Sequence, residues 1–180
     1  MKSFIVIFIL LSSSLYGEAK IYFGLSYANV SEKFSDIEAE SSSDALKVKV
    51  GYGEIDAYAI ELSVDTIKSE SNIFSNDDGD KYALNIELVK SFDLDTFIYP
   101  YFKAGFGAGH MNIDRLLQSK LNYGSFNFEV GTFMQINESL DFELGYNYKD
   151  ISYESIEMLS EDLNFESYST TLYFGFNTRF

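Results

Sequence analysis

The sequence predicts an all-β fold, an eight-stranded antiparallel up-and-down transmembrane β-barrel. Three observations lead to this prediction. Apolar and polar residues alternate with the period of two that a strand imposes, the N-terminal residues have the pattern of an export signal, and the chain ends on a strand with an aromatic face. A closed sheet pairs all of its backbone groups internally, which is what a β structure inside a bilayer must do.

The first 19 residues form the predicted signal peptide. Met1 and Lys2 make a short basic start, residues 4–11 are apolar, and Gly17-Glu18-Ala19 supplies small residues for cleavage. The apolar stretch is too short to cross a membrane as a helix. We therefore expect cleavage after Ala19 or after Gly17, and a single barrel domain over residues 20–180.

Composition narrows the class further. A formal net charge of −15 argues against nucleic acid as a partner. The absence of Cys excludes disulfides and thiolate metal sites. The 14 Tyr and 17 Phe are many for a water-facing β protein, whereas a membrane barrel with aromatic girdles needs them.

Eight alternating segments account for the mature chain. They run over 21–30, 46–53, 57–67, 81–90, 98–109, 123–136, 140–149 and 168–180. The connections after the second, fourth and sixth segments are short. Those after the odd-numbered segments are predicted to be longer, over 31–45, 68–80, 110–122 and 150–166, which is the pattern of bacterial outer-membrane barrels.

Alternation alone does not decide which face lines the lumen, because a soluble ligand-carrying barrel would place the apolar face inside. The polar face, however, is rich in Gly and Ala, which suits a crowded eight-strand interior. Its charges also nearly balance, with Lys47, Lys49, Lys103, Lys149 and Arg179 against Glu61, Asp65, Glu87, Glu129, Asp141 and Glu143. Balance is expected where charges are buried. The polar face is therefore predicted to line the lumen.

These positions predict a lumen charge network. With strand midpoints aligned, the residues at neighbouring levels are Lys49, Glu61, Glu87, Lys103, Glu129 and Glu143. Each of the two lysines is expected between carboxylates, and Arg179 is expected beside Asp141 nearer the periplasmic end. The network is either a plug that fills the lumen or a gate whose salt bridges exchange partners. Eight strands leave little room for a channel, which favours the plug.

Three stretches resemble a known family: 99–109 (YPYFKAGFGAG), 128–131 (FEVG) and 140–148 (LDFELGYNY). They are similar to the small outer-membrane β-barrel proteins, namely outer-membrane protein X and the barrel domain of outer-membrane protein A. The resemblance implies the outer membrane of a Gram-negative bacterium. It also implies that the C-terminal strand, with Leu172, Phe174, Phe176 and Phe180 on one face, is the signal read by the barrel-assembly machinery.

Candidate sites for chemistry are weak. His110 lies at the outer rim on the lipid side, and Asn112 stands where lipid A deacylases of this kind have a Ser nucleophile, so a hydrolytic site is not expected. The stretch 76–80 (NDDGD) lacks the closing Glu of a calcium loop and is read as a solvated turn. Acidic loop residues such as Glu32 are likewise expected to be solvated, the alternative being divalent cations that bridge them to lipopolysaccharide.

The sequence therefore predicts a non-enzymatic outer-membrane barrel without cofactor or metal. It would act in envelope integrity or in surface interaction through its loops, as a monomer. Its expected partners are outer-membrane lipid, lipopolysaccharide and, during insertion, the barrel-assembly machinery. The alternatives are a narrow ion or small-solute pore, an adhesin and, last, a lipid A-modifying enzyme.

Overall fold

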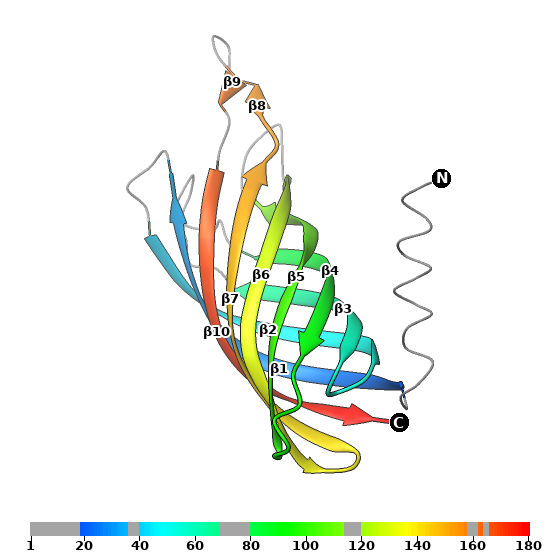
Figure 1. The fold of residues 1–180 in the computed structure, drawn as a ribbon. Helices are drawn as coiled ribbons and strands as arrows, with labels where there is room; N and C mark the ends of the chain where they lie inside the picture. The colour runs from blue at the N-terminus through cyan, green and yellow to red at the C-terminus, as the bar shows by residue number, and fades with distance from the viewer. Residues whose placement is uncertain (1–18, 36–39, 69–79, 114–119, 158–161, 164–165) are drawn as a thin grey trace, which may run out of the picture.

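The computed structural model describes residues 19–35, 40–68, 80–113, 120–157, 162–163 and 166–180 (Figure 1). Eight antiparallel strands close into a barrel: β1 (Lys20–Phe34), β2 (Glu40–Gly53), β3 (Tyr58–Lys68), β4 (Lys81–Ser91), β5 (Ile98–Asn112), β6 (Lys120–Asn137), β7 (Leu140–Tyr153) and β10 (Glu166–Arg179). The predicted fold class is confirmed. Residues 1–18 lie outside the described part, so the signal peptide stays a prediction.

The register sets the tilt of the barrel. Following paired residues once around the sheet from Gly24 returns to β1 at Phe34, ten residues further on. With eight strands, this shift inclines the strands by about 40° to the barrel axis. Such a tilt lets about ten residues of each strand cross the apolar part of a bilayer.

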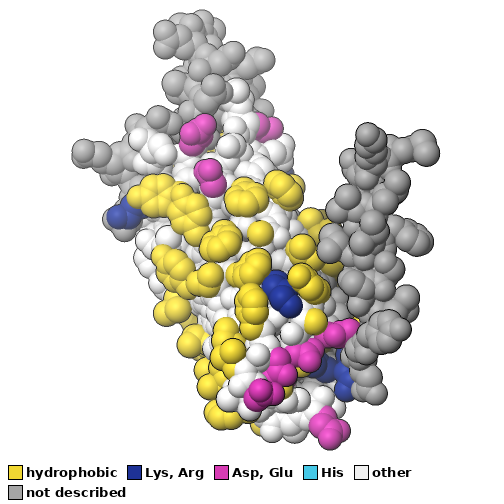
Figure 2. Space-filling model, viewed as in Figure 1, with side chains coloured by type: hydrophobic (Ala, Val, Ile, Leu, Met, Phe, Trp, Pro, Cys, Tyr) yellow, Lys and Arg dark blue, Asp and Glu magenta, His cyan; other side chains and the backbone are white. Residues whose placement is uncertain are grey.

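The two faces of the sheet are assigned as predicted. Outward aromatic and aliphatic side chains are exposed, for example Phe23 at 55%, Leu172 at 57% and Phe106 at 66%, whereas inward charged side chains are buried. Figure 2 shows apolar side chains over much of the visible face of the barrel wall. A soluble barrel with an apolar lumen is therefore excluded.

The barrel has a turn end and a loop end. The turn end carries the short connections, and the Phe180 N–H there donates to the Ile21 carbonyl oxygen at 2.9 Å, so both termini of the barrel meet (Figure 1). In the turn between β4 and β5, Asp95 adopts a φ of 55° and its N–H donates to Asp93 Oδ1 at 2.8 Å. An Asx turn tolerates this left-handed conformation.

At the loop end the predicted boundaries were wrong, because the strands run further than expected. Most of 31–45 belongs to β1 and β2, and parts of 110–122 and 150–166 belong to β5, β6, β7 and β10. Two short strands, β8 (Ile156–Glu157) and β9 (Asp162–Leu163), pair with each other above the barrel. The polar outward residues there had been read as loop, since they break the apolar alternation.

No helix in the described ranges is long and apolar enough to cross a membrane.

Candidate functional site: the filled lumen

The lumen holds a nearly balanced set of buried charges. Six basic and seven acidic side chains are buried along it: Lys47, Lys49, Lys81, Lys103, Lys149 and Arg179, and Glu32, Glu61, Asp65, Glu87, Glu129, Asp141 and Glu143. The whole chain, in contrast, carries −15. Near balance is the arrangement expected where charges have left water.

Lys103 is the hub of the central network, which we define as Lys47, Lys49, Lys103, Glu61, Glu129 and Glu143. Its ammonium lies 2.9 Å from Glu61 Oε2, 2.8 Å from Glu129 Oε1 and 2.8 Å from Glu143 Oε1. These four side chains are completely buried. The network crosses the lumen, because β5 contributes the lysine and β3, β6 and β7 contribute the carboxylates.

Two further lysines complete the central network. Lys49 lies between Glu61, at 3.2 Å, and Glu143, which it contacts closely. Lys47 Nζ lies 3.2 Å from Glu129 Oε2. The network thus contains equal numbers of ammonium and carboxylate groups, so no net charge is buried in it.

Tyrosines from three strands pack into the same level. Tyr22 donates to Glu61 Oε1 at 2.6 Å, and Tyr101 donates to Glu143 Oε1 at 2.9 Å. Tyr173 contacts both Tyr101 and Glu129. Their rings fill space that water would need, and their hydroxyls satisfy carboxylate lone pairs. Sequence reasoning had not placed Tyr22 or Tyr101 in the network, although their inward parity was readable from the alternation.

Two ion pairs flank the central network. Arg179 contacts Asp141 toward the turn end, and Lys149 lies 2.6 Å from Asp65 toward the loop end. Glu87 differs from the other predicted residues. It is 2% exposed, its contact is Asn127 Nδ2 at 3.4 Å, and it has no ion pair among the described residues. Glu87 is thus at the predicted level but is not paired with a lysine.

A second polar cluster near the loop end was missed by sequence reasoning. Glu32 contacts the Lys81 ammonium and accepts from Tyr153 and Ser167, each at 2.7 Å. Glu32 is 4% exposed, so its expected solvation was wrong. The error follows from the misplaced end of β1. If the alternation of inward and outward residues is continued past Val30, Glu32 falls on the inward face.

An apolar cluster surrounds this second polar cluster. It contains Phe34, Ala83, Met111, Ile113, Leu121, Tyr123, Ile151 and Tyr153, all buried inside the loop end. The alternation inverts here: outward residues such as Lys33, Lys68 and Lys120 are polar and exposed. Above the bilayer the wall meets water, so the apolar side chains turn inward as they do in a soluble β domain. We call these eight residues the loop-end cluster.

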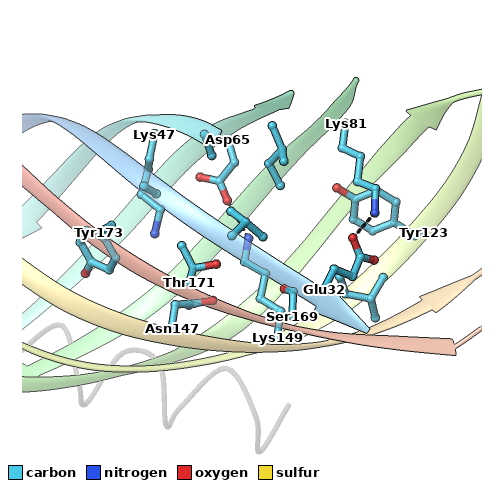
Figure 3. Close-up of a pocket in the computed structure, with 15 residues that line it drawn as sticks. Glu32, Lys47, Asp65, Lys81, Tyr123, Asn147, Lys149, Ser169, Thr171 and Tyr173 are labelled. Carbon is cyan, nitrogen blue, oxygen red and sulfur yellow. Dashed lines mark hydrogen bonds and ion pairs between the residues drawn. The ribbon is translucent and has the colours of Figure 1, made fainter. Parts of the chain in front are cut away.

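Between the central network and the loop-end cluster lies a small cavity. Figure 3 shows Lys47, Asp65, Lys149 and Tyr173 on one side of it and the Lys81–Glu32 pair at the other. Its volume is about 30 Å³. That is room for about two water molecules and too little for a solute. Side chains thus fill the lumen on both sides of this cavity, at the central network and at the loop-end cluster.

The outward face of β10 is continuous with its neighbours. Phe180 packs edge-on against Phe23 at 5.9 Å between ring centroids, Phe174 lies 5.8 Å from Tyr27, and Phe176 lies 5.4 Å from Phe142. Leu172 is exposed on the same face. The four residues of the expected assembly signal thus share one lipid-facing surface; their recognition stays a prediction.

His110 lies outside the lumen, as its parity predicted. Its ring lies 5.4 Å from that of Tyr82, its partner across β4 and β5. Asn112 follows two residues later in β5. Within the described ranges, the contact found for His110 is this aromatic ring and not a Ser or Cys nucleophile, and no cluster of three or more potential metal ligands occurs there. Residues 76–79 of the calcium-like stretch lie outside the described ranges.

A closed eight-stranded sheet with an apolar outer wall and a polar, filled lumen defines a transmembrane β-barrel. The model of the outer membrane protein beta-barrel domain family matches residues 4–180. The chain belongs to this family and is an outer-membrane protein. No curated protein sequence matches it.

Solved structures show the same architecture. Neisserial surface protein A is 16% identical, with a TM-score of 0.70 over 91% of this chain and 100% of that chain. The attachment invasion locus protein of Yersinia pestis is 16% identical, with a TM-score of 0.58 over 91% and 100%. The N-terminal barrel domain of OprF from Pseudomonas aeruginosa is 15% identical, with a TM-score of 0.51 over 86% and 96%. At these identities the likeness concerns the fold.

Proposed function

We propose that this protein is a sealed, non-enzymatic outer-membrane barrel that acts in envelope integrity or in surface interaction through its loop end. One observation carries the proposal: side chains fill the lumen at two levels, the central network and the loop-end cluster. A barrel filled in this way offers no continuous water path. Its rigid wall instead holds the loop-end connections at the cell surface, since external loops in these barrels are the longer ones.

Planar-bilayer recording tests the seal. Purified, folded protein is expected to give no stable openings. Stable openings whose conductance changes in the Lys103→Ala variant would overturn the seal in favour of the ion or small-solute pore. Openings that this variant leaves unchanged would equally contradict it and would place the conducting path away from Lys103.

The non-enzymatic part of the proposal is supported at the rim. Hydrolysis of an acyl chain needs a nucleophile within hydrogen-bond reach of a base, and His110 contacts the ring of Tyr82. Lipid A from cells with and without the protein is expected to have the same acylation pattern. A lost acyl chain that returns in the His110→Ala variant would contradict this.

The proposed surface interaction does not name a binding partner, and adhesion is the alternative function that would name one. The walls of β1, β2, β7 and β10 continue beyond the apolar surface, which supports display of the loop end. Shortening one external connection at a time and measuring binding of cells to a host-cell layer tests adhesion. Equal binding by all shortened variants would leave envelope integrity, measured as sensitivity to detergent, as the function. The proposed partners are lipopolysaccharide and the barrel-assembly machinery, and the proposed state is a monomer.

A further inference from the structure

One lysine lies on the outer wall at the turn end, away from the other outward lysines. Lys33, Lys68 and Lys120 are at the loop end, whereas Lys90 is near the end of β4. Lys90 lies two residues after Leu88, which is 44% exposed, so the two side chains point to the same outward face of β4. Among the described residues, Lys90 is the one outward basic side chain in this half of the barrel.

The surroundings of Lys90 are aromatic. Its ammonium lies 4.2 Å from the ring centroid of Tyr58 and 5.4 Å from that of Phe92. Its register partners are Tyr58 on β3 and Phe102 on β5, and the rings of Phe92 and Phe102 are 6.0 Å apart. All three rings are exposed to between 41% and 47%. This group of residues is an outward-facing aromatic frame around one cation.

The ammonium of Lys90 has ring faces as neighbours. No ion pair of Lys90 occurs among the described residues, and Asp93 and Asp95 lie in the turn, where Asp93 accepts from the Asp95 N–H. Ring faces attract a cation, but they do not accept conventional hydrogen bonds from its N–H groups. At the level of an aromatic girdle, which is the level of the lipid headgroups, the N–H donors that the rings leave unused can be accepted by a lipid phosphate.

The wall above Lys90 suits an acyl chain. Leu88 follows it along the outward face of β4, flanked in register by Ile60 on β3 and by Ala104 on β5. Ala104 is small and stands between the large outward rings of Phe102 and Phe106 in β5, so the wall is lower there. A phosphate on Lys90 would place its chain along this lower strip, toward the middle of the bilayer.

We propose that Lys90, framed by Tyr58, Phe92 and Phe102, binds the phosphate of a phospholipid in the periplasmic leaflet. The leaflet follows from the turn end, which faces the periplasm in this family's arrangement. The site fixes the depth and rotation of the barrel in the membrane. It does not depend on whether the lumen conducts or what the loops contact.

Native mass spectrometry of the folded full barrel tests the site with defined lipids. Dioleoyl phosphatidylglycerol and dioleoyl phosphatidylethanolamine both carry the phosphate, whereas dioleoylglycerol lacks it. For both phospholipids, the dissociation constant of the first bound lipid is expected to rise about five-fold in Lys90→Gln, as for the loss of one lysine beside a lipid headgroup. Lys90→Arg retains the charge and should bind as the wild type does.

Lys68→Gln is the matched control, because Lys68 is an outward lysine on the adjacent strand at the loop end. Its phospholipid affinity should equal that of the wild type, and dioleoylglycerol should bind wild type and Lys90→Gln equally. Equal phospholipid affinity of wild type and Lys90→Gln would overturn the site. So would an equal loss in Lys68→Gln, which would indicate a general charge effect. Heat-modifiable migration on gels verifies that each variant is folded.

Discussion

At the scale of single residues, the charge network depends on contacts from every side of the lumen. Lys103 touches three carboxylates at 2.8–2.9 Å in a place without exposed surface. The cost of transferring these groups from water is offset only while each of them has its partner. Lys103 therefore stabilises the fold chiefly by keeping three neighbours paired.

The first prediction concerns this lysine. Lys103→Met retains most of the side-chain volume but leaves Glu61, Glu129 and Glu143 short of a cation. We expect a loss of about 3–5 kcal/mol in the free energy of unfolding, measured by urea titration of the barrel in phospholipid vesicles. Lys68→Met, on the exposed outer wall, is the control and should change it by less than about 0.5 kcal/mol. If the Lys103→Met barrel has the same free energy of unfolding as the wild type, the network is dispensable for stability.

The second prediction concerns glycines that make room for tyrosines. A Cβ on Gly145 would lie 2.6 Å from Tyr101 Oη and would also meet the Tyr173 ring, whereas a Cβ on Gly124 would have no atom within 4 Å. Gly145→Ala should cost about 1–3 kcal/mol, because the tyrosines must shift. Gly124→Ala should be close to neutral. Comparable losses of unfolding free energy in the two variants, in the same urea titration, would refute the idea that Gly145 makes room for the tyrosines.

At the scale of elements, β10 closes the barrel and carries the expected assembly signal. Its outward residues continue the apolar wall, and its last N–H, on Phe180, donates to Ile21 of β1. The expected recognition by the assembly machinery and the observed closure with β1 therefore involve the same residue, Phe180.

The third prediction tests whether Phe180 acts as part of the assembly signal or only as one more apolar residue of the outer wall. Phe180→Ala should lower the amount of heat-modifiable barrel in the outer-membrane fraction, because the terminal aromatic residue is part of the expected signal. Phe106→Ala is the control, since Phe106 is similarly exposed, at 66% against 72% for Phe180, but lies in β5. Equal assembly of wild type and Phe180→Ala, measured by gel migration before and after heating, would reject the signal.

At the scale of the whole molecule, two separate groups of side chains fill the lumen. The central network does so within the membrane-spanning part, and the loop-end cluster does so where the barrel enters water. Their spacing means that removal of one leaves the other in place.

The fourth prediction follows from this separation. The triple variant Phe34→Ala, Met111→Ala and Leu121→Ala empties the loop-end cluster but retains Lys103 and its partners. Planar-bilayer recordings should show no stable openings, as for wild type and for the Phe106→Ala control. Openings confined to the triple variant would place the only constriction at the loop end, contrary to a lumen filled at its centre.

The sequence by itself determined the strand number, the faces and most of the lumen residues. Period-two alternation is a local property of each strand, so it marks Lys49, Lys103 and Glu143 as inward and Phe23 and Phe106 as outward without any tertiary information. The near balance of inward charge could be recognised for the same reason.

Only the tertiary structure decided which inward residues meet. Contacts across a lumen depend on the ten-residue shift around the barrel and on side-chain reach. Glu87 therefore lies at the predicted level yet pairs with no lysine of the described residues, while Tyr22 and Tyr101 complete the network. The ends of β1 and β2 were also decided there. Above the bilayer the surroundings of the wall change from lipid to water, and the apolar side chains therefore point inward. The residues there break the apolar alternation of the sequence, yet they continue the strands. Glu32 is consequently buried against Lys81.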